Sequence, residues 1–295
     1  MADILLTGGT GQVGLALQRL TWPDGTALHA PPRAELDLAD PASVERALAA
    51  RPYAAVISSG AYTAVDKAES EVAEAWRVNA LAPAILAAGA ARAGIPIVHL
   101  STDYVFAGDA PGPYIETDPV APVGVYGASK EGGEQAVRTA NPRHAVLRTA
   151  WVVGPDGKNF IRTMLRLAAD REEVGVVSDQ HGCPTFTPDL AAVVQAVTLA
   201  LMNDPTAEIG TFHVVNDGEA SWSDFATAIF EGSAARGGPS ARVKPITTAE
   251  YRTPALRPAN SRLATGKIGR AYGVRMRPWR EALDETLDVL VGPRG

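Results

Sequence analysis

The sequence predicts an α/β protein in which a doubly wound parallel sheet is joined to a smaller α+β domain. Two observations predict this class. Through the first half of the chain, short apolar segments alternate with segments of helical periodicity. That alternation is typical of a parallel sheet with helices on both faces. From Trp151 onward the alternation becomes less regular, which indicates a second, smaller domain.

The first half of the chain predicts five strands and four helices. Asp40 is a suitable N-cap for the second helix, and Pro41 favours its first position. The Ala-rich stretch "ALAPAILAAGAARAG" is interrupted by Pro83, Gly89 and Arg92, so it predicts a buried helix and not a membrane span. Strands are expected at residues 4–7, 27–30, 54–58, 96–101 and 144–149, and helices at 13–20, from 41, at 70–93 and at 126–138.

The second half predicts further helices, short strands and two long loops. The segments "ARGGPSARVKP" and "RTPALRPANSR" are rich in glycine and proline and predict the loops. We expect one domain at residues 1–150, with returning segments around 174–216, and a second at residues 151–295, partly interleaved with the first. Helices are expected at residues 159–170, 188–202, 221–235 and 279–290, and strands at 174–177 and 211–215.

Composition and charge exclude several classes of protein. The 295 residues are 46% hydrophobic and 20% charged, which predicts a soluble globular protein. A net charge of -6 and no cluster of Lys and Arg argue against a nucleic-acid surface. The only cysteine, Cys183, cannot form an intrachain disulfide and suits a reducing cytosol. The apolar run at the N-terminus is too short for a signal peptide or a span, so we expect a cytoplasmic protein.

A glycine-rich turn follows the first expected strand. In "ILLTGGTGQVG", Gly8, Gly11 and Gly14 are three residues apart, between a strand and a helix. Glycines there permit a tight turn, a close approach to a pyrophosphate and close packing of helix on strand. The alternative is a glycine turn that only packs well. The strand–turn–helix context favours a dinucleotide, so we predict that residues 1–150 bind the cofactor and residues 151–295 the substrate.

The end of the second expected strand indicates which dinucleotide is bound. Enzymes that use NAD have an acidic residue there, but this chain has Pro32 followed by Arg33. An arginine can pair with a 2′-phosphate, so we predict NADPH, with NADH as a weaker substitute. The alternative is that Arg33 is a solvated loop residue.

The spacing G-x-x-G-x-x-G resembles that of the short-chain dehydrogenase/reductase superfamily. The resemblance implies a Rossmann-like sheet, a Ser or Thr after the fourth strand, and a later Tyr-x-x-x-Lys helix. "STDYVF" and "YGASK" occur in that order and supply Thr102, Tyr126 and Lys130. By analogy, Asp37 and Leu38 would lie against the adenine.

Tyr126 and Lys130 are four residues apart, on one face of the expected helix. We expect the ammonium of Lys130 to lower the tyrosine pKa from about 10. Tyr126 would then give its proton to a carbonyl oxygen as hydride arrives at the carbon, and Thr102 would hydrogen-bond the same oxygen. Without the glycine turn and Thr102, the pair would be ordinary helix surface.

Asp103 and Tyr104 indicate which reaction is catalysed. Sugar-nucleotide dehydratases of the superfamily have Thr-Asp-Glu at this point, and Tyr104 replaces that glutamate. The chain therefore lacks the acid/base pair for elimination. Epimerases usually have small residues after the serine, so the stretch favours simple reduction.

Eight motifs together resemble the dTDP-4-dehydrorhamnose reductase family: "GGTGQVG", "AYTAVDKAE", "STDYVFAG", "YGASKEGGE", "RTAWVVG", "NFIRTMLRLA", "SDQHGCPT" and "RPANSRL". They occur in the family's order, from Ile4 to about Leu263. The resemblance implies that NADPH reduces the 4-keto group of a dTDP-linked 4-keto-6-deoxy sugar. The product would be dTDP-L-rhamnose, a precursor of surface polysaccharide.

The resemblance also implies site residues. Trp151 offers a flat face and one N–H donor, or else it is a core tryptophan at the domain junction. Arg257 and Arg262 are candidates for the substrate diphosphate, or else they are surface charges. The implied cofactor-binding residues are Gly8, Thr10, Gly11, Gln12, Val13, Gly14, Arg33, Asp37, Leu38, Ala61, Tyr62, Thr63, Asn79, Tyr126 and Lys130. The implied substrate-binding residues are Thr102, Asp103, Tyr104, Tyr126, Trp151, Asn159, Phe160, Gln180, Arg257 and Arg262.

Some members of this family dimerise through a metal held by glutamates. Ala16 and Pro188 stand at two of those places, so we predict no metal, and a monomer or a homodimer without a metal bridge. His99 and Cys183 are expected to be packed residues and not ligands. The alternatives for function are a related sugar-nucleotide 4-ketoreductase or epimerase, or a non-catalytic NADPH-binding regulatory subunit.

Overall fold

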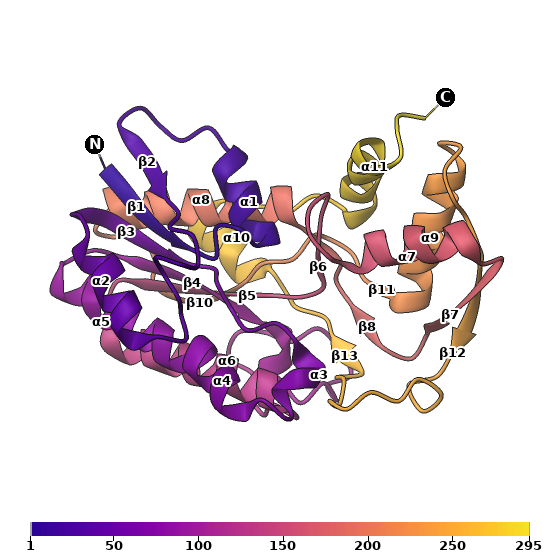
Figure 1. Ribbon diagram of the computed structural model, residues 1–295, viewed down its shortest axis with the longest axis horizontal. Helices are drawn as coiled ribbons and strands as arrows, with labels where there is room; N and C mark the ends of the chain where they lie inside the picture. Colours follow the sequence, from indigo (N-terminus) through magenta and orange to yellow (C-terminus); the bar gives the residue numbers. More distant parts are fainter. Residues whose placement is uncertain (1, 295) are drawn as a thin grey trace.

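Six parallel strands form the central sheet of the computed structural model, which describes residues 2–294 (Figure 1). Their order is β10-β5-β4-β3-β1-β2, and every neighbouring pair is parallel. The chain leaves β1 first toward β2 and then returns to β3 on the other side. This reversal opens a crevice at the carboxyl ends of the strands. The strands are β1 (Ala2–Thr7), β2 (Thr26–His29), β3 (Tyr53–Ser58), β4 (Ile97–Thr102), β5 (His144–Thr149) and β10 (Gly210–His213).

Helices cover both faces of this sheet, as the alternation predicts. Neighbouring residues of a strand point to opposite faces, so Leu6 packs in one hydrophobic cluster and Leu5 in another. The first cluster is completed by α1 (Gln12–Arg19), α8 (Thr187–Asn203) and α10 (Gly266–Tyr272). The second is completed by α2 (Pro41–Ala49), α5 (Ala82–Arg92) and α6 (Val125–Ala140). The predicted fold class is confirmed.

The helix expected at residues 70–93 contains a π-helical turn. It begins as α4 (Val72–Trp76), widens into the turn Arg77–Leu81, and continues as α5. A Cβ on Gly133 of α6 would lie only 2.1 Å from the carbonyl oxygen of Asn79. The turn therefore packs directly on the backbone of α6. Single π turns are frequent at functional sites.

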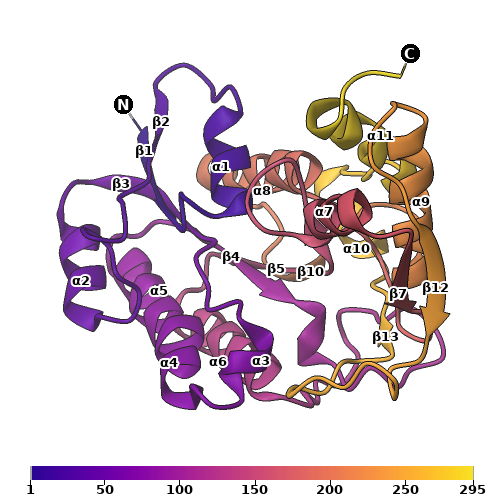
Figure 2. The same cartoon turned by 45° about the vertical axis from the view of Figure 1, so that its right-hand side comes forward.

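The elements beside the sheet (Figure 2) enclose a third hydrophobic cluster. The expected helices are present as α7 (Phe160–Asp170), α9 (Trp222–Ala234) and α11 (Trp279–Leu290). Part of the segment 174–216 returns to the central sheet: α8 packs on one face of it, and β10 is its edge strand. The strand β7 (Glu173–Val177) does not return, and pairs with β12 (Arg242–Ile246). The short strands are β6 (Val152–Val153), β8 (His181–Gly182), β9 (Thr185–Phe186), β11 (Ala220–Ser221) and β13 (Asn260–Ser261).

Apart from the two-residue strands, which were not expected, three elements differ from the expectation. The end of "ARGGPSARVKP" is strand β12 and not loop, because β7 offers it a parallel partner from a distant part of the chain. The helices α3 (Val65–Ala68) and α10 were not predicted, because four and seven residues are too few to show a clear period. Within residues 2–294, no helix is long and apolar enough to span a membrane.

Candidate active site

A cavity of about 950 Å³ lies at the carboxyl ends of the central strands. Its walls come from the glycine turn after β1, the segments that follow β2 and β3, the end of β4, the start of α6 and the β5–β6 connection. This is the crevice that the strand order creates. Every residue predicted to bind the cofactor lines it, except Asn79.

Close packing requires glycine in the turn after β1. Gly8 has φ +71, and a Cβ there would lie 2.6 Å from the Cα of Gly60. A Cβ on Gly14 would lie 2.2 Å from the carbonyl oxygen of Gly8. Helix α1 begins after Gly11, which provides no side-chain cap. Free N–H groups at the start of a helix favour an anionic group.

Arg33 and Asp37 line the cavity beyond β2. The Nε of Arg33 lies 3.6 Å from Oδ2 of Asp37, and the Arg33 side chain is 79% exposed. An exposed contact of this length is weak and leaves the guanidinium free to rearrange.

Asn79 lies behind the cavity wall and holds the segment that follows β3. Its Oδ1 accepts from the backbone N–H of Tyr62 at 2.8 Å, and its Nδ2 donates to the Tyr62 carbonyl at 3.1 Å. The same Nδ2 donates to Oγ of Ser129 in α6 at 3.0 Å. Asn79 therefore organises the wall formed by Ala61, Tyr62 and Thr63, and does not itself line it.

Thr102, Tyr126 and Lys130 meet at the end of β4 and the start of α6, and all three line the cavity. The Thr102 hydroxyl donates to Oδ1 of Asp103 at 2.8 Å. Lys130 is buried, and its Nζ donates to the carbonyl oxygen of Leu100 at 2.6 Å. The tyrosine and lysine lie one helical turn apart, as the spacing predicts.

The expected lowering of the Tyr126 pKa is wrong for this arrangement. Burial, and then the charge of Asp103, raise the pKa of Tyr126 to about 12, although a hydrogen bond with Thr102 opposes them. Burial lowers the pKa of Lys130 to about 8 against the opposing charge of Glu134. The phenol of Tyr126 is therefore protonated at neutral pH, which is the form that a proton donor needs.

Asp103 and Tyr104 form the neighbouring part of the wall. Asp103 is buried, and burial raises the pKa of its carboxyl group to about 6. Within the described residues, its Oδ2 has no hydrogen-bond partner. The rings of Tyr104 and Tyr126 meet edge to face, with their centroids 5.4 Å apart.

Trp151 lines the cavity with an unusual backbone. Its φ of +47 is the only positive value for a non-glycine residue in the described chain. Its indole stacks on that of Trp222, with the ring centroids 3.5 Å apart. A Cβ on Gly182 would lie 2.4 Å from the Trp151 ring. Trp151 thus packs on Trp222 and also forms part of the cavity wall, and its role in substrate binding stays a prediction.

The other predicted substrate residues do not line this cavity. Asn159 is the N-cap of α7. The ring of Phe160 packs against that of Trp222, with the ring centroids 4.6 Å apart. Gln180 donates to Thr248. Arg257 binds Asp66 at 2.8 Å, and Arg262 binds Asn260 and Glu219. Arg262 lines a separate cavity of about 240 Å³.

Sequence reasoning missed several wall residues. Lys158 directly precedes the predicted Asn159 and could have been named with it. Trp222 carried no local signal, because its stack on Trp151 joins two distant parts of the chain. Further wall residues without a prediction are Gly9, Pro31, Leu36, Ser59, Gly60, Val65, Glu71, Glu74, Val78, Leu100, Ser101, Thr149, Ala150 and Val152.

His99 and Cys183, which were expected to be packed residues, are both buried. His99 is fully buried, and its Nδ1 contacts the Ser58 hydroxyl at 3.0 Å. Cys183 is buried, and burial raises the pKa of its thiol to about 11. Ala16 is part of a core cluster, and Pro188 lies in the first turn of α8. Among residues 2–294, no group of three or more His, Cys, Asp or Glu could hold a metal.

Comparison with known proteins identifies relatives along nearly the whole chain. The family model described as "RmlD substrate binding domain" matches residues 1–291. A dTDP-4-dehydrorhamnose reductase from Sinorhizobium fredii is 44% identical over 280 residues, which cover 95% of this chain and 94% of that protein. A probable dTDP-4,6-dihydroxy-2-methyloxan-3-one 4-ketoreductase from Streptomyces antibioticus is 42% identical over 290 residues, covering 97% and 95%.

A solved structure gives the same result. The crystal structure of dTDP-4-dehydrorhamnose reductase from Bacillus anthracis in complex with NADP has a TM-score of 0.89. It is 34% identical in sequence, and the match covers 97% of this chain and 99% of that one. Fold, cavity and sequence agree, and the chain belongs to the dTDP-4-dehydrorhamnose reductase family.

Proposed function

We propose that this protein uses NADPH to reduce the 4-keto group of dTDP-4-dehydro-L-rhamnose, forming dTDP-L-rhamnose for surface polysaccharide. The observation that carries the proposal is the meeting of Thr102, Tyr126 and Lys130 in a cavity whose far wall is the glycine turn. Relatives with this activity in their names, and one with NADP bound, support it.

The chemistry follows from the protonation states of these residues. When bound, the reduced nicotinamide supplies hydride to the carbonyl carbon. Tyr126, protonated at neutral pH, would give its proton to the carbonyl oxygen, and the Thr102 hydroxyl would donate to that oxygen in place of Asp103. Lys130 keeps one N–H on the Leu100 carbonyl and has two left for the ribose and the phenol. Its positive charge also stabilises the phenolate that remains after the transfer.

The two parts of the chain would bind different molecules. Residues 1–150, with returning segments, would hold NADPH through the implied cofactor residues, with Asn79 acting through the Tyr62 backbone. Residues 151–295 would hold the dTDP-sugar, with Trp151 at the boundary. Arg257 and Arg262 would reach the substrate diphosphate only by exchanging their present partners, Asp66 and Glu219. We also propose a cytoplasmic location and a monomer or a homodimer without a metal bridge.

The Streptomyces antibioticus relative favours a second candidate, the reduction of the 4-keto group of another dTDP-linked sugar. The same three residues would act on it. The sugar pocket would distinguish the two substrates, because its shape and hydrogen bonds recognise the configuration of the sugar hydroxyls.

The test is a turnover assay with purified protein, NADPH and dTDP-4-keto-L-rhamnose, followed by absorbance of the reduced cofactor. We expect oxidation of NADPH, and a loss of about 10²-fold or more in Tyr126→Phe. No oxidation above that variant would contradict the proposal. A panel that varies base and sugar separately distinguishes the two substrates.

A further inference from the structure

Three basic residues line the cavity, and two of them already have a role in the proposed function. Arg33 lies beside Asp37, and Lys130 donates to the Leu100 carbonyl. The third, Lys158, is exposed, and its ammonium has no hydrogen-bond or carboxylate partner within residues 2–294. It is therefore the cavity cation that is ready to bind an added anion.

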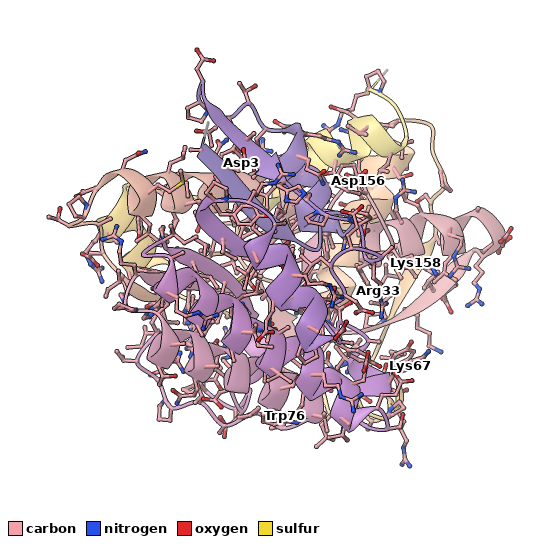
Figure 3. All side chains as sticks on the ribbon, turned by 60° about the vertical axis from the view of Figure 1, so that its left-hand side comes forward. Asp3, Arg33, Lys67, Trp76, Asp156 and Lys158 are labelled. Atoms are coloured by element: carbon pink, nitrogen blue, oxygen red, sulfur yellow. The ribbon has the colours of Figure 1, made fainter. Side chains whose placement is uncertain are left out.

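Side chains on both sides of Lys158 bind residues of α1. On one side, Nη2 of Arg19 donates to Oδ1 of Asp156 at 2.7 Å, and Nη1 contacts Oδ2. On the other side, Nδ2 of Asn159 donates to Oε1 of Gln12 at 2.9 Å. Figure 3 shows Asp156 and Lys158 beside α1, on the same side of the molecule as Arg33. The loop that precedes α7 therefore lies along α1, with one contact at its last residue, Arg19, and one at its first, Gln12.

Gly157 brings this loop close to the glycine turn. Its φ is +67, and a Cβ there would lie 3.0 Å from Cγ of Gln12. Gln12 is the first residue of α1, where the free N–H groups of the helix begin. Lys158, the next residue after Gly157, is therefore held at the end of the helix that attracts anions.

The negative charges of the walls favour such a cation. Four carboxylates line the cavity: Asp37, Glu71, Glu74 and Asp103. A dianionic ligand beside them needs positive charge as well as backbone N–H groups. Lysine is a compact point charge on a flexible stem and is a common phosphate ligand.

We propose that Lys158 binds the diphosphate group of a bound nucleotide, together with the start of α1. This rests on the proposed function, because both NADPH and a dTDP-sugar carry a diphosphate. The contacts of the loop with Gln12 favour the diphosphate of the dinucleotide.

The experiment compares binding of NADPH, NADH and dTDP to wild type, Lys158→Ala and Lys67→Ala by titration. Lys67 is exposed and lies outside the cavity wall, so Lys67→Ala is the matched control (Figure 3). We expect Lys158→Ala to bind NADPH and NADH about tenfold more weakly, because one charge-assisted hydrogen bond is lost. Lys158→Arg should retain most of the affinity, and Lys67→Ala should match wild type.

Each other outcome has a definite meaning. Weakening for dTDP alone would keep the diphosphate assignment and move it to the substrate. Weakening for NADPH but not NADH would point to the 2′-phosphate and overturn the inference, as would unchanged affinities for all three nucleotides. If wild type itself binds neither dinucleotide, the proposed function fails. If wild type binds and Lys158→Ala binds equally well, only the present inference fails.

Discussion

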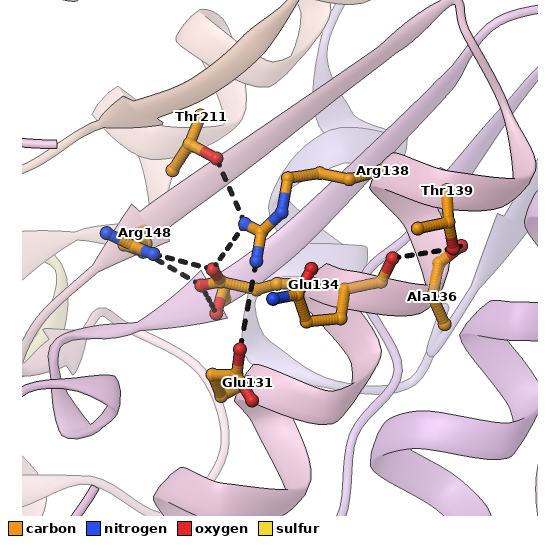
Figure 4. Close-up of polar contacts among 9 residues, drawn as sticks. Glu131, Glu134, Ala136, Arg138, Thr139, Arg148 and Thr211 are labelled. Carbon is orange, nitrogen blue, oxygen red and sulfur yellow. Dashed lines mark hydrogen bonds and ion pairs between the residues drawn. The ribbon is translucent and has the colours of Figure 1, made fainter. Parts of the chain in front are cut away.

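The carboxylate of Glu134 meets the guanidinium of Arg148 through two hydrogen bonds inside the core (Figure 4). Nε of Arg148 lies 2.9 Å from Oε1, and Nη2 lies 2.7 Å from Oε2. Ser101 donates to Oε1 at 2.5 Å, and Arg138 donates to Oε2 at 2.9 Å. Glu134 therefore joins α6, which carries Tyr126 and Lys130, to the end of β4, which carries Thr102.

Removing the charge of Glu134 should destabilise the protein strongly. Glu134→Gln leaves the buried Arg148 without its carboxylate, which we expect to cost about 3–5 kcal/mol in the free energy of unfolding. Glu131→Gln is the control, because Glu131 contacts Arg138 only at 3.9 Å and is partly exposed. Urea unfolding of the three proteins measures the difference. Equal losses in the two variants would show that the two-point contact adds little.

The rate of reduction should fall as pH rises above about 8. The pKa of Lys130 is lowered to about 8, whereas that of Tyr126 is raised to about 12. The tyrosine thus stays protonated where the lysine loses its charge, and the alkaline limb of kcat/KM belongs to Lys130. In Lys130→Arg the remaining activity should persist to higher pH, since arginine stays charged. If the alkaline limb of kcat/KM stays at the same pH in Lys130→Arg, it belongs to a group other than Lys130.

Asp103 should make the wild-type protein less stable as pH rises from about 4 to 6. The pKa of this carboxyl group is raised from 3.8 to about 6, so the folded state holds a proton that the unfolded state has released. The stabilisation is present below the unfolded pKa and is lost as pH passes the folded pKa. Relative to wild type, Asp103→Asn should gain about 2 kcal/mol between pH 4 and pH 7. Unfolding curves at both pH values test this, and a constant difference would contradict it.

Arg33 should set the preference for the phosphorylated cofactor. Arg33→Ala should raise the KM for NADPH by roughly tenfold and leave that for NADH nearly unchanged, because only NADPH carries a 2′-phosphate. Arg46→Ala is a suitable control, since Arg46 is also exposed and paired but lies outside the cavity wall. A tenfold or greater preference for NADPH that survives in Arg33→Ala would refute this role.

Local patterns predicted the parts of the site that depend on local structure. The turn at Gly8 and Gly14 and the pair Tyr126–Lys130 follow from spacing within one strand–turn–helix or one helix. The strand order then brings them together, because the carboxyl ends of parallel strands share one edge of the sheet.

Local patterns could not predict the contacts between distant parts of the chain. The pKa of Tyr126 depends on burial by several segments and on Asp103, not on its distance from Lys130 along the helix. Arg257 is paired with Asp66 from the other half of the chain, and no local pattern announces that partner. Strand β12 likewise exists because of β7.

The return of α8 and β10 to the central sheet limits how the chain can be divided. A fragment that ends near residue 150 would leave β5 as a bare sheet edge and would expose the apolar face that α8 covers. The central sheet is therefore continuous in space and discontinuous in sequence.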